Sequence, residues 1–139
     1  MSLFLLDTTT ISDYLKRDRT VISNILKTSP NKIYISAISK YEIAYGLYKK
    51  PSLIPEFSKQ LQEFYRLTND LPFTSIAAEM AGEIANNLKK KGQPIGVPDV
   101  LIAATAIHEN LTLVTSNTKH FQRIEKLEIV DWKKIEPTT

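Results

Sequence analysis

The chain has 139 residues, of which 42% are hydrophobic and 24% are charged, and its formal net charge is +3. This suits one globular domain with its own core, and the absence of cysteine excludes disulfides, thiolate metal sites and cysteine nucleophiles. No apolar run approaches the roughly 20 residues of a membrane span, and the N-terminus lacks the pattern of a signal peptide, so we expect a cytoplasmic protein with no membrane contact. The small positive charge favours an anionic partner only slightly.

Short runs of Val, Ile and Leu alternate with amphipathic stretches along the chain. The runs predict five strands, at Leu3–Leu6, Ile33–Ser36, Leu71–Thr74 (bent by Pro72), Leu111–Thr115 and Leu127–Val130. Helical spacing between them predicts helices through Ile11 and Leu15, through Ile22–Leu26, and over Ile38–Lys50, Leu53–Thr68, Ile76–Lys91, Asp99–Glu109 and Lys119–Phe121. The helix over Asp99–Glu109 is apolar on several faces, which indicates a central position in the fold.

Strands that alternate with helices are typical of a parallel sheet covered by helices on both faces. We therefore expect an α/β fold: a three-layer α/β/α sandwich with a mostly parallel central sheet of about five strands. Nothing in the sequence divides the chain, so we predict a single domain over residues 1–135 and a short flexible tail over 136–139.

Three acidic residues stand near the starts of predicted helices. Asp7 closes the first strand, Glu42 lies about one turn after the second, and Asp99 opens the apolar helix. Each has a purely structural interpretation. Asp7 can cap the helix that follows it, Glu42 can complete a capping box with Ser39, and Asp99 meets the helix dipole favourably in a first turn.

Taken together, the three acids have a second interpretation. In an open parallel sheet, the carboxyl ends of the strands and the N-termini of the following helices share one edge, where ligands bind. Like charges at roughly 4 Å repel by about 4 kcal/mol at an effective dielectric constant near 20, so converging carboxylates need a cation or a shifted pKa. Mg²⁺ or Mn²⁺ accepts such oxygen ligands and keeps several waters, which can supply a nucleophile for attack on a phosphodiester.

Four segments carry a family resemblance, in order and spacing: Leu5–Thr8, Ile35–Gly46, Gly92–Ala104 and Leu113–Thr118. They resemble the PIN domain and, within that family, the VapC-like toxins of type II toxin–antitoxin systems. The resemblance covers nearly the whole chain. It implies a PIN-like sandwich and an Mg²⁺- or Mn²⁺-dependent endoribonuclease that hydrolyses RNA phosphodiester bonds. It also implies a homodimer and a cognate antitoxin protein that holds the enzyme inactive.

On the family pattern, Asp7, Glu42 and Asp99 are the catalytic and metal-ligating acids. Thr8 orients Asp7 through its hydroxyl.

The polar rim is completed by Thr115 and Asn117. The sequence departs from the pattern at His120, where many relatives carry a fourth acid, and at Thr9, where Asn or Ser is common. His120 either weakens the binding of a second metal or contacts the phosphate of the substrate. Its plain interpretation is an exposed polar residue on a short helix.

Two other readings of the function remain open. The loss of the fourth acid at His120 suggests a catalytically weak PIN-fold module for RNA binding or regulation. A receiver-like phosphoryl-transfer protein also has an Asp after its first strand, but Thr8 and Thr9 stand where that chemistry needs a further acid.

Two surface motifs have bland interpretations as well. Tyr41, Tyr45 and Tyr48 fall at helical spacing and favour a core or interface role over base stacking, and Lys89–Lys91 favours a solvated helix end over an RNA contact. The apolar residues Leu15 and Ile25 indicate core packing, and any exposed surplus there would suit an antitoxin segment.

Overall fold

The computed structural model describes residues 2–134, and a five-stranded sheet lies at its centre, in the order β3-β2-β1-β4-β5. The strands are β1 (Phe4–Leu6), β2 (Ile33–Ser36), β3 (Asn69–Leu71), β4 (Thr112–Val114) and β5 (Ile129–Val130). All four pairs of neighbouring strands are parallel. The expected α/β class is therefore confirmed, with a fully parallel sheet in this part of the chain. The predicted tail at 136–139, with residue 135, lies outside the described residues.

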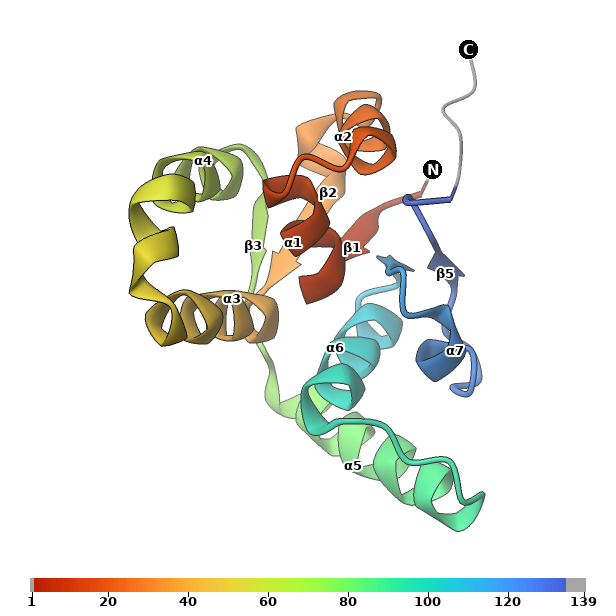
Figure 1. Ribbon diagram of the computed structural model, residues 1–139. Coiled ribbons are helices and arrows are strands. Elements are labelled where there is room, and N and C mark those ends of the chain that lie inside the picture. The colour runs from red at the N-terminus through yellow and green to blue at the C-terminus, as the bar shows by residue number, and fades with distance from the viewer. Residues whose placement is uncertain (1, 135–139) are drawn as a thin grey trace.

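Helices cover both faces of the sheet (Figure 1). One layer contains α1 (Thr8–Leu15), α2 (Arg19–Leu26), α3 (Ala37–Lys49) and α4 (Ile54–Leu67). The other contains α5 (Ser75–Lys90) and α6 (Val97–His108), and the short α7 (Thr118–Phe121) lies near β5 (Figure 1). Two 3₁₀ turns, η1 (Pro30–Lys32) and η2 (Pro51–Leu53), precede β2 and α4.

The strands supply side chains to two separate cores because successive residues of a strand point to opposite faces. Leu5 and Leu113 pack with the residues of α5 and α6, whereas Leu6 and Val114 pack with those of α1 to α4. Both faces of the sheet are thus buried, which explains the continuous apolar runs in the sequence. The predicted central helix is confirmed in α6, whose residues 102–106 are all buried.

Two local predictions are wrong. The third strand ends at Leu71, before Pro72, because proline has no N–H to continue the ladder of hydrogen bonds. The helix α3 begins at Ala37, and its cap is Ser36, whose hydroxyl oxygen accepts a hydrogen bond from the N–H of Ser39. The predicted capping box from Ser39 to Glu42 therefore does not form, and Glu42 is left for another role.

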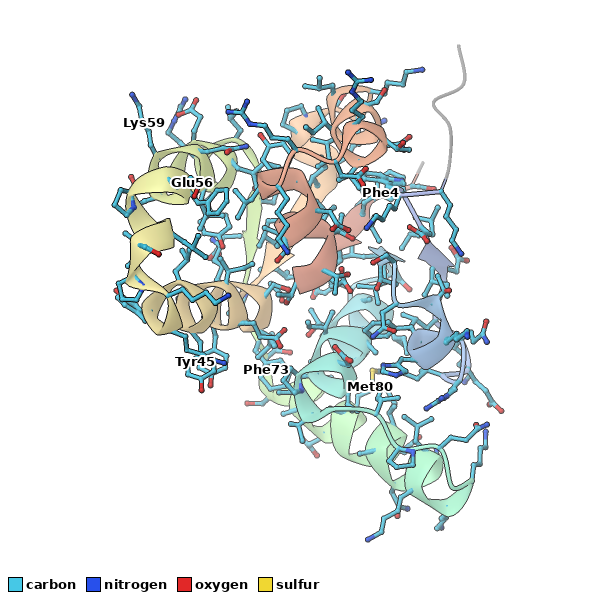
Figure 2. The ribbon with its side chains drawn as sticks, viewed as in Figure 1. Phe4, Tyr45, Glu56, Lys59, Phe73 and Met80 are labelled. Carbon is cyan, nitrogen blue, oxygen red and sulfur yellow. The ribbon has the colours of Figure 1, made fainter. Side chains whose placement is uncertain are left out.

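The tyrosines of α3 are not core residues. Tyr41, Tyr45 and Tyr48 are between 56% and 75% exposed, and Tyr45 points away from the sheet (Figure 2). This follows from the helical period, since the buried Ser39 and Ile43 lie two residues from Tyr41 and hence on the opposite side of α3. In the described part of the chain, we find no helix with the length and apolar character needed to cross a membrane.

The topology marks one edge of the sheet for ligands. From the central β1 the chain adds β2 and β3 on one side, and then crosses over to place β4 and β5 on the other. The order of the strands thus reverses between β1 and β4. In sheets of this type, ligands bind outside the carboxyl ends of the strands at such a reversal.

Candidate active site

Asp7 lies at this reversal, directly after β1, and caps α1. Its backbone N–H donates to the carbonyl of Val114 at 3.0 Å, which ties it to β4. The Oδ1 atom accepts from the N–H of Thr10 at 2.9 Å and from the hydroxyl of Thr9 at 2.8 Å, and Oδ2 accepts from the hydroxyl of Thr115 at 2.5 Å. A carboxylate has about four lone-pair positions, so these bonds leave room for one further partner.

The carboxyl group of Asp7 is only 3% exposed. Burial raises its pKa, and the hydrogen bonds from Thr115, Thr10 and Thr9 act in the opposite direction by favouring the ionised form. The fold therefore holds a buried acid in a fixed position with neutral donors. A cation at its remaining lone pair would offset the cost of ionisation.

Glu42 approaches the same edge from α3. The hydroxyl of Thr8 donates to Oε1 of Glu42 at 2.6 Å, and the oxygen of Thr8 also lies 3.3 Å from the hydroxyl of Ser39. The prediction that Thr8 orients Asp7 is thus wrong, since Thr8 orients Glu42. The physical reason is the packing of α1 against α3, which turns Thr8 towards Glu42. Thr9, the next residue, contacts Asp7 instead.

Asp99 completes the group from the first turn of α6. Burial raises its pKa, followed in effect by the negative charges of Glu42 and Asp7, whereas His120 lowers it. The ring atom Nδ1 of His120 lies 3.9 Å from Oδ2 of Asp99 and 2.9 Å from Nδ2 of Asn117. The three acids predicted to converge therefore interact electrostatically at one edge of the sheet.

Among residues 2–134, no group of three acidic or histidine side chains is arranged to hold a metal ion directly. The donors present nevertheless fit a hard divalent cation, since Mg²⁺ is usually bound through one or two carboxylates and keeps several waters. Asp7 offers a fixed oxygen with a free lone pair, and Asp99 is a half-buried acid whose pKa is raised by neighbouring charge. Both features are those of a site that a cation would stabilise.

Sequence reasoning missed the supporting roles of Thr9 and Thr10. Thr9 donates to Asp7, and the hydroxyl of Thr10 donates to the carbonyl of Val114 at 2.9 Å, which fixes α1 to β4. The signal available in the sequence was the run of three threonines directly after a buried strand. Three polar β-branched residues are unusual there unless each hydroxyl has a partner.

A parallel α/β sandwich with a buried acid after β1, and with further acids on α3 and α6, defines a PIN-type domain with an acidic crevice. The sequence profile of the PIN domain matches residues 4–127. The chain belongs to the PIN domain family, and its predicted resemblance to VapC-like proteins is confirmed by the following relatives.

The chain is 34% identical over 130 residues to the tRNA(fMet)-specific endonuclease VapC of Salmonella typhimurium, a match that covers 93% of this chain and 97% of that protein. It is 39% identical over 104 residues to ribonuclease VapC2 of Rickettsia felis, covering 75% of this chain and 77% of that protein. Among solved structures, it is similar to VapBC2 from Rickettsia felis bound to a promoter DNA fragment, with a TM-score of 0.85, 33% identity and coverage of 94% and 98%. DNA-bound VapBC from Salmonella typhimurium gives a TM-score of 0.85 at 29% identity, with coverage of 95% and 99%.

Proposed function

We propose that this protein is a VapC-type endoribonuclease that hydrolyses RNA phosphodiester bonds with Mg²⁺ or Mn²⁺, and that it acts in the cytoplasm as the toxin of a toxin–antitoxin pair. The observation that carries this proposal is the interaction of Asp7, Glu42 and Asp99 at one sheet edge. It gains support from relatives that are themselves named ribonucleases. When bound, the divalent cation supplies an activated water and offsets charge on the phosphate.

The residues of the chain have distinct tasks in this proposal. Asp7 holds the cation at the buried end, where Thr115 fixes its second oxygen. Asp99 and Glu42 hold it from the open side, and Thr8 keeps the carboxylate of Glu42 in place.

The rim is built from Thr115, Asn117 and His120. The N–H of Asn117 donates to the hydroxyl oxygen of Thr115 at 3.0 Å, and the side chain of Asn117 contacts the His120 ring. His120 is 44% exposed, so its ring can donate a hydrogen bond to a phosphate oxygen of the substrate.

Cleavage of a single-stranded RNA by the purified protein, with and without Mn²⁺ or Mg²⁺, tests this function. We expect Asp7→Asn and Asp99→Asn each to reduce metal-dependent cleavage by at least about 100-fold, since each removes a charged ligand. Asp70→Asn is the matched control, because Asp70 lies on β3 in an exposed ion pair with Lys40. Full activity in either crevice variant would refute the assignment.

A second candidate is a catalytically weak PIN-fold RNA-binding or regulatory module. The described residues contain no preassembled three-residue metal site, and His120 lies beside Asp99, which favours this alternative. Calorimetric titration with Mn²⁺ separates the two. Saturable binding that Asp99→Asn weakens supports the nuclease, whereas no binding at millimolar Mn²⁺ supports the alternative.

We propose that the antitoxin occupies a groove of about 220 Å³ between α1, α3 and α4. Its walls include Leu15, Leu47 and Phe57, and it reaches Thr8 and Glu42. An apolar segment bound there would cover the crevice. The predicted apolar edge is otherwise core, since Leu15 and Ile25 are buried. Protection of α1 and α3 from hydrogen exchange on antitoxin binding measures this occupancy, and unchanged exchange there would exclude it.

We also propose a homodimer that forms through the α3 tyrosines. A contiguous row of exposed aromatic side chains is uncommon on a monomer, and tyrosine is enriched at protein interfaces. The rings of Tyr41 and Tyr45 are stacked, with centroids 6.2 Å apart, so they present a flat surface to a partner.

A further inference from the structure

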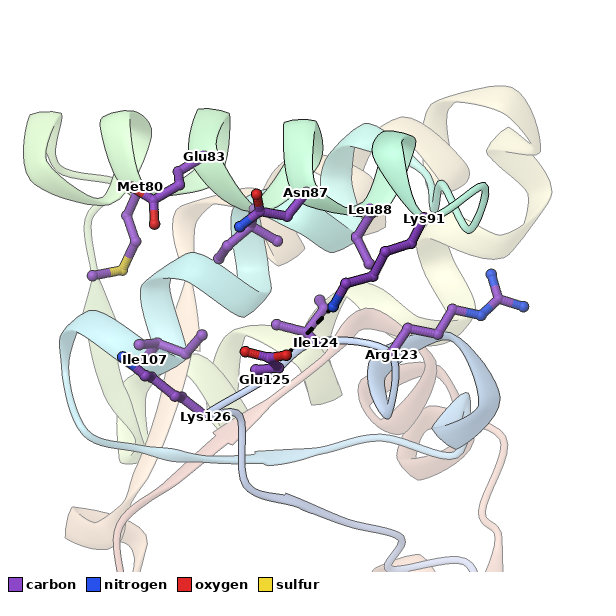
Figure 3. Close-up of a pocket in the computed structure, with 11 residues that line it drawn as sticks. Met80, Glu83, Asn87, Leu88, Lys91, Ile107, Arg123, Ile124, Glu125 and Lys126 are labelled. Carbon is purple, nitrogen blue, oxygen red and sulfur yellow. Dashed lines mark hydrogen bonds and ion pairs between the residues drawn. The ribbon is translucent and has the colours of Figure 1, made fainter.

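A second pocket lies between α5, the end of α6 and the turn that follows α7 (Figure 3). Its volume is about 210 Å³. The floor is apolar and includes Leu88, Ile107 and Ile124. The rim carries three cationic side chains, which are Lys91, Arg123 and Lys126.

The size and chemistry of this pocket limit what it can bind. Pockets for drug-sized ligands measure roughly 300–1,000 Å³, so this one suits a smaller group. An apolar floor beneath a cationic rim matches a nucleotide, which combines a flat ring with an anionic phosphate. The acids on the rim, Glu83 and Glu125, are fewer than the cations.

The cations are available to a phosphate. Lys91 lies 3.4 Å from Glu125, but both side chains are more than half exposed, and such a pair is weak and screened by salt. Arg123 contacts only the carbonyl of Pro94, at 3.5 Å, among the interactions described. A guanidinium has five donors, so Arg123 retains enough for a bidentate contact with phosphate.

The pocket is joined to the acidic crevice through α7. His120 lies 3.9 Å from Asp99, and Arg123 follows it by three residues. Pro94, which Arg123 contacts, belongs to the loop that leads into α6 and Asp99. Figure 3 shows Arg123 and Lys91 at one end of the pocket and Lys126 at the other. A strand that leaves the crevice past His120 therefore reaches the pocket at its Arg123 end.

The backbone of Lys126 is strained, which points in the same direction. Its φ of 67° is in the left-handed region, which costs a residue with a Cβ about 1 kcal/mol. Glycine would remove this cost, yet the position holds a lysine at the edge of the pocket. Strained residues of this kind cluster at ligand sites.

We propose that this pocket is an RNA subsite, in which a nucleotide flanking the scissile bond places its base on the apolar floor and its phosphate against Lys91, Arg123 and Lys126. The proposal rests on the proposed ribonuclease function and adds a determinant of which RNA is bound.

The test measures binding of a fluorescent single-stranded RNA by anisotropy over a salt series, with Asp7→Asn in every protein to prevent cleavage. The combined variant Lys91→Gln/Arg123→Gln/Lys126→Gln is expected to bind about tenfold more weakly or worse. Its plot of log affinity against log salt should be shallower by about two units, because each lost phosphate contact on a single strand removes about 0.7. Lys59→Gln, on α4 and far from the pocket (Figure 2), is the matched control and should change neither quantity.

Two further measurements keep charge, base contact and folding apart. Lys126→Gly alone should raise the melting temperature while weakening RNA binding, a combination that misfolding cannot produce. An oligonucleotide with abasic sites should bind the parent protein about tenfold more weakly than its intact counterpart. Parent-like affinity in the combined variant, or equal binding of abasic RNA, would overturn the subsite.

Cleavage by the wild-type protein with Mn²⁺ is followed in parallel. If wild type cleaves RNA while the combined variant keeps full affinity, the subsite is wrong and the proposed function stands. If wild type neither binds nor cleaves RNA, the proposed function fails and the subsite fails with it.

Discussion

Asp7 both caps α1 and presents a buried charge to the crevice, and substitution can separate the two roles. In Asp7→Asn the amide oxygen still accepts from the N–H of Thr10, and Asn is as good a cap as Asp. The hydroxyl of Thr115 can turn to accept from the amide nitrogen. In Asp7→Ala, both the cap and the acceptor for Thr115 are lost.

The expected difference in the free energy of unfolding follows from these contacts. Loss of the cap costs about 1 kcal/mol. The hydroxyl of Thr115 is fully buried and would lose its acceptor, which costs about 1–3 kcal/mol. Thr9 is exposed, so water can replace its contact. We therefore expect Asp7→Ala to be about 2–4 kcal/mol less stable than Asp7→Asn, and Asp7→Asn to equal or exceed the wild type at neutral pH without metal.

Urea denaturation in EDTA, followed by circular dichroism from neutral to acid pH, provides the assay. Burial raises the folded pKa of Asp7, so the folded state binds more protons than the unfolded state between that raised pKa and the ordinary value near 3.8. Wild-type stability should hence rise relative to Asp7→Asn as the pH falls through this window, and the gap between them should close. If Asp7→Asn is as unstable as Asp7→Ala, or if the gap does not depend on pH, the reasoning is wrong.

Two further predictions concern other parts of the fold. Gly92 has a φ of 69° after α5, so Gly92→Ala should destabilise the protein by about 1 kcal/mol, whereas Gly82→Ala, within the same helix and with open space around its Cβ, should stabilise it by up to about 1 kcal/mol; equal effects in urea denaturation would contradict this. For the dimer, replacing Tyr41, Tyr45 and Tyr48 together by serine should halve the mass measured by light scattering. Leu26→Ser, at an exposed apolar residue of α2, should leave the mass unchanged, and a tyrosine variant that stays dimeric would exclude this face.

Local sequence signals were reliable where neighbours along the chain decide the outcome. Asp7 as a helix cap, Gly92 after α5 and Asp99 in a first turn all depend on residues within a few positions. The capping box at Ser39 failed because Ser36 and Ser39 are both acceptable caps. Only the point at which β2 ends decides between them, and Ser36 is the last residue of that strand.

The sequence by itself determined the fold class, the order of the elements and the three acids, because hydrophobic period and capping chemistry are written in short segments. It also indicated the PIN-like pattern, through the order of those segments. Only the tertiary structure decided that Thr8 contacts Glu42 and that His120 lies beside Asp99, because these pairs are 34 and 21 positions apart in the chain. Helix packing sets such contacts, and no periodicity in a single sequence reports which way a first-turn hydroxyl will face.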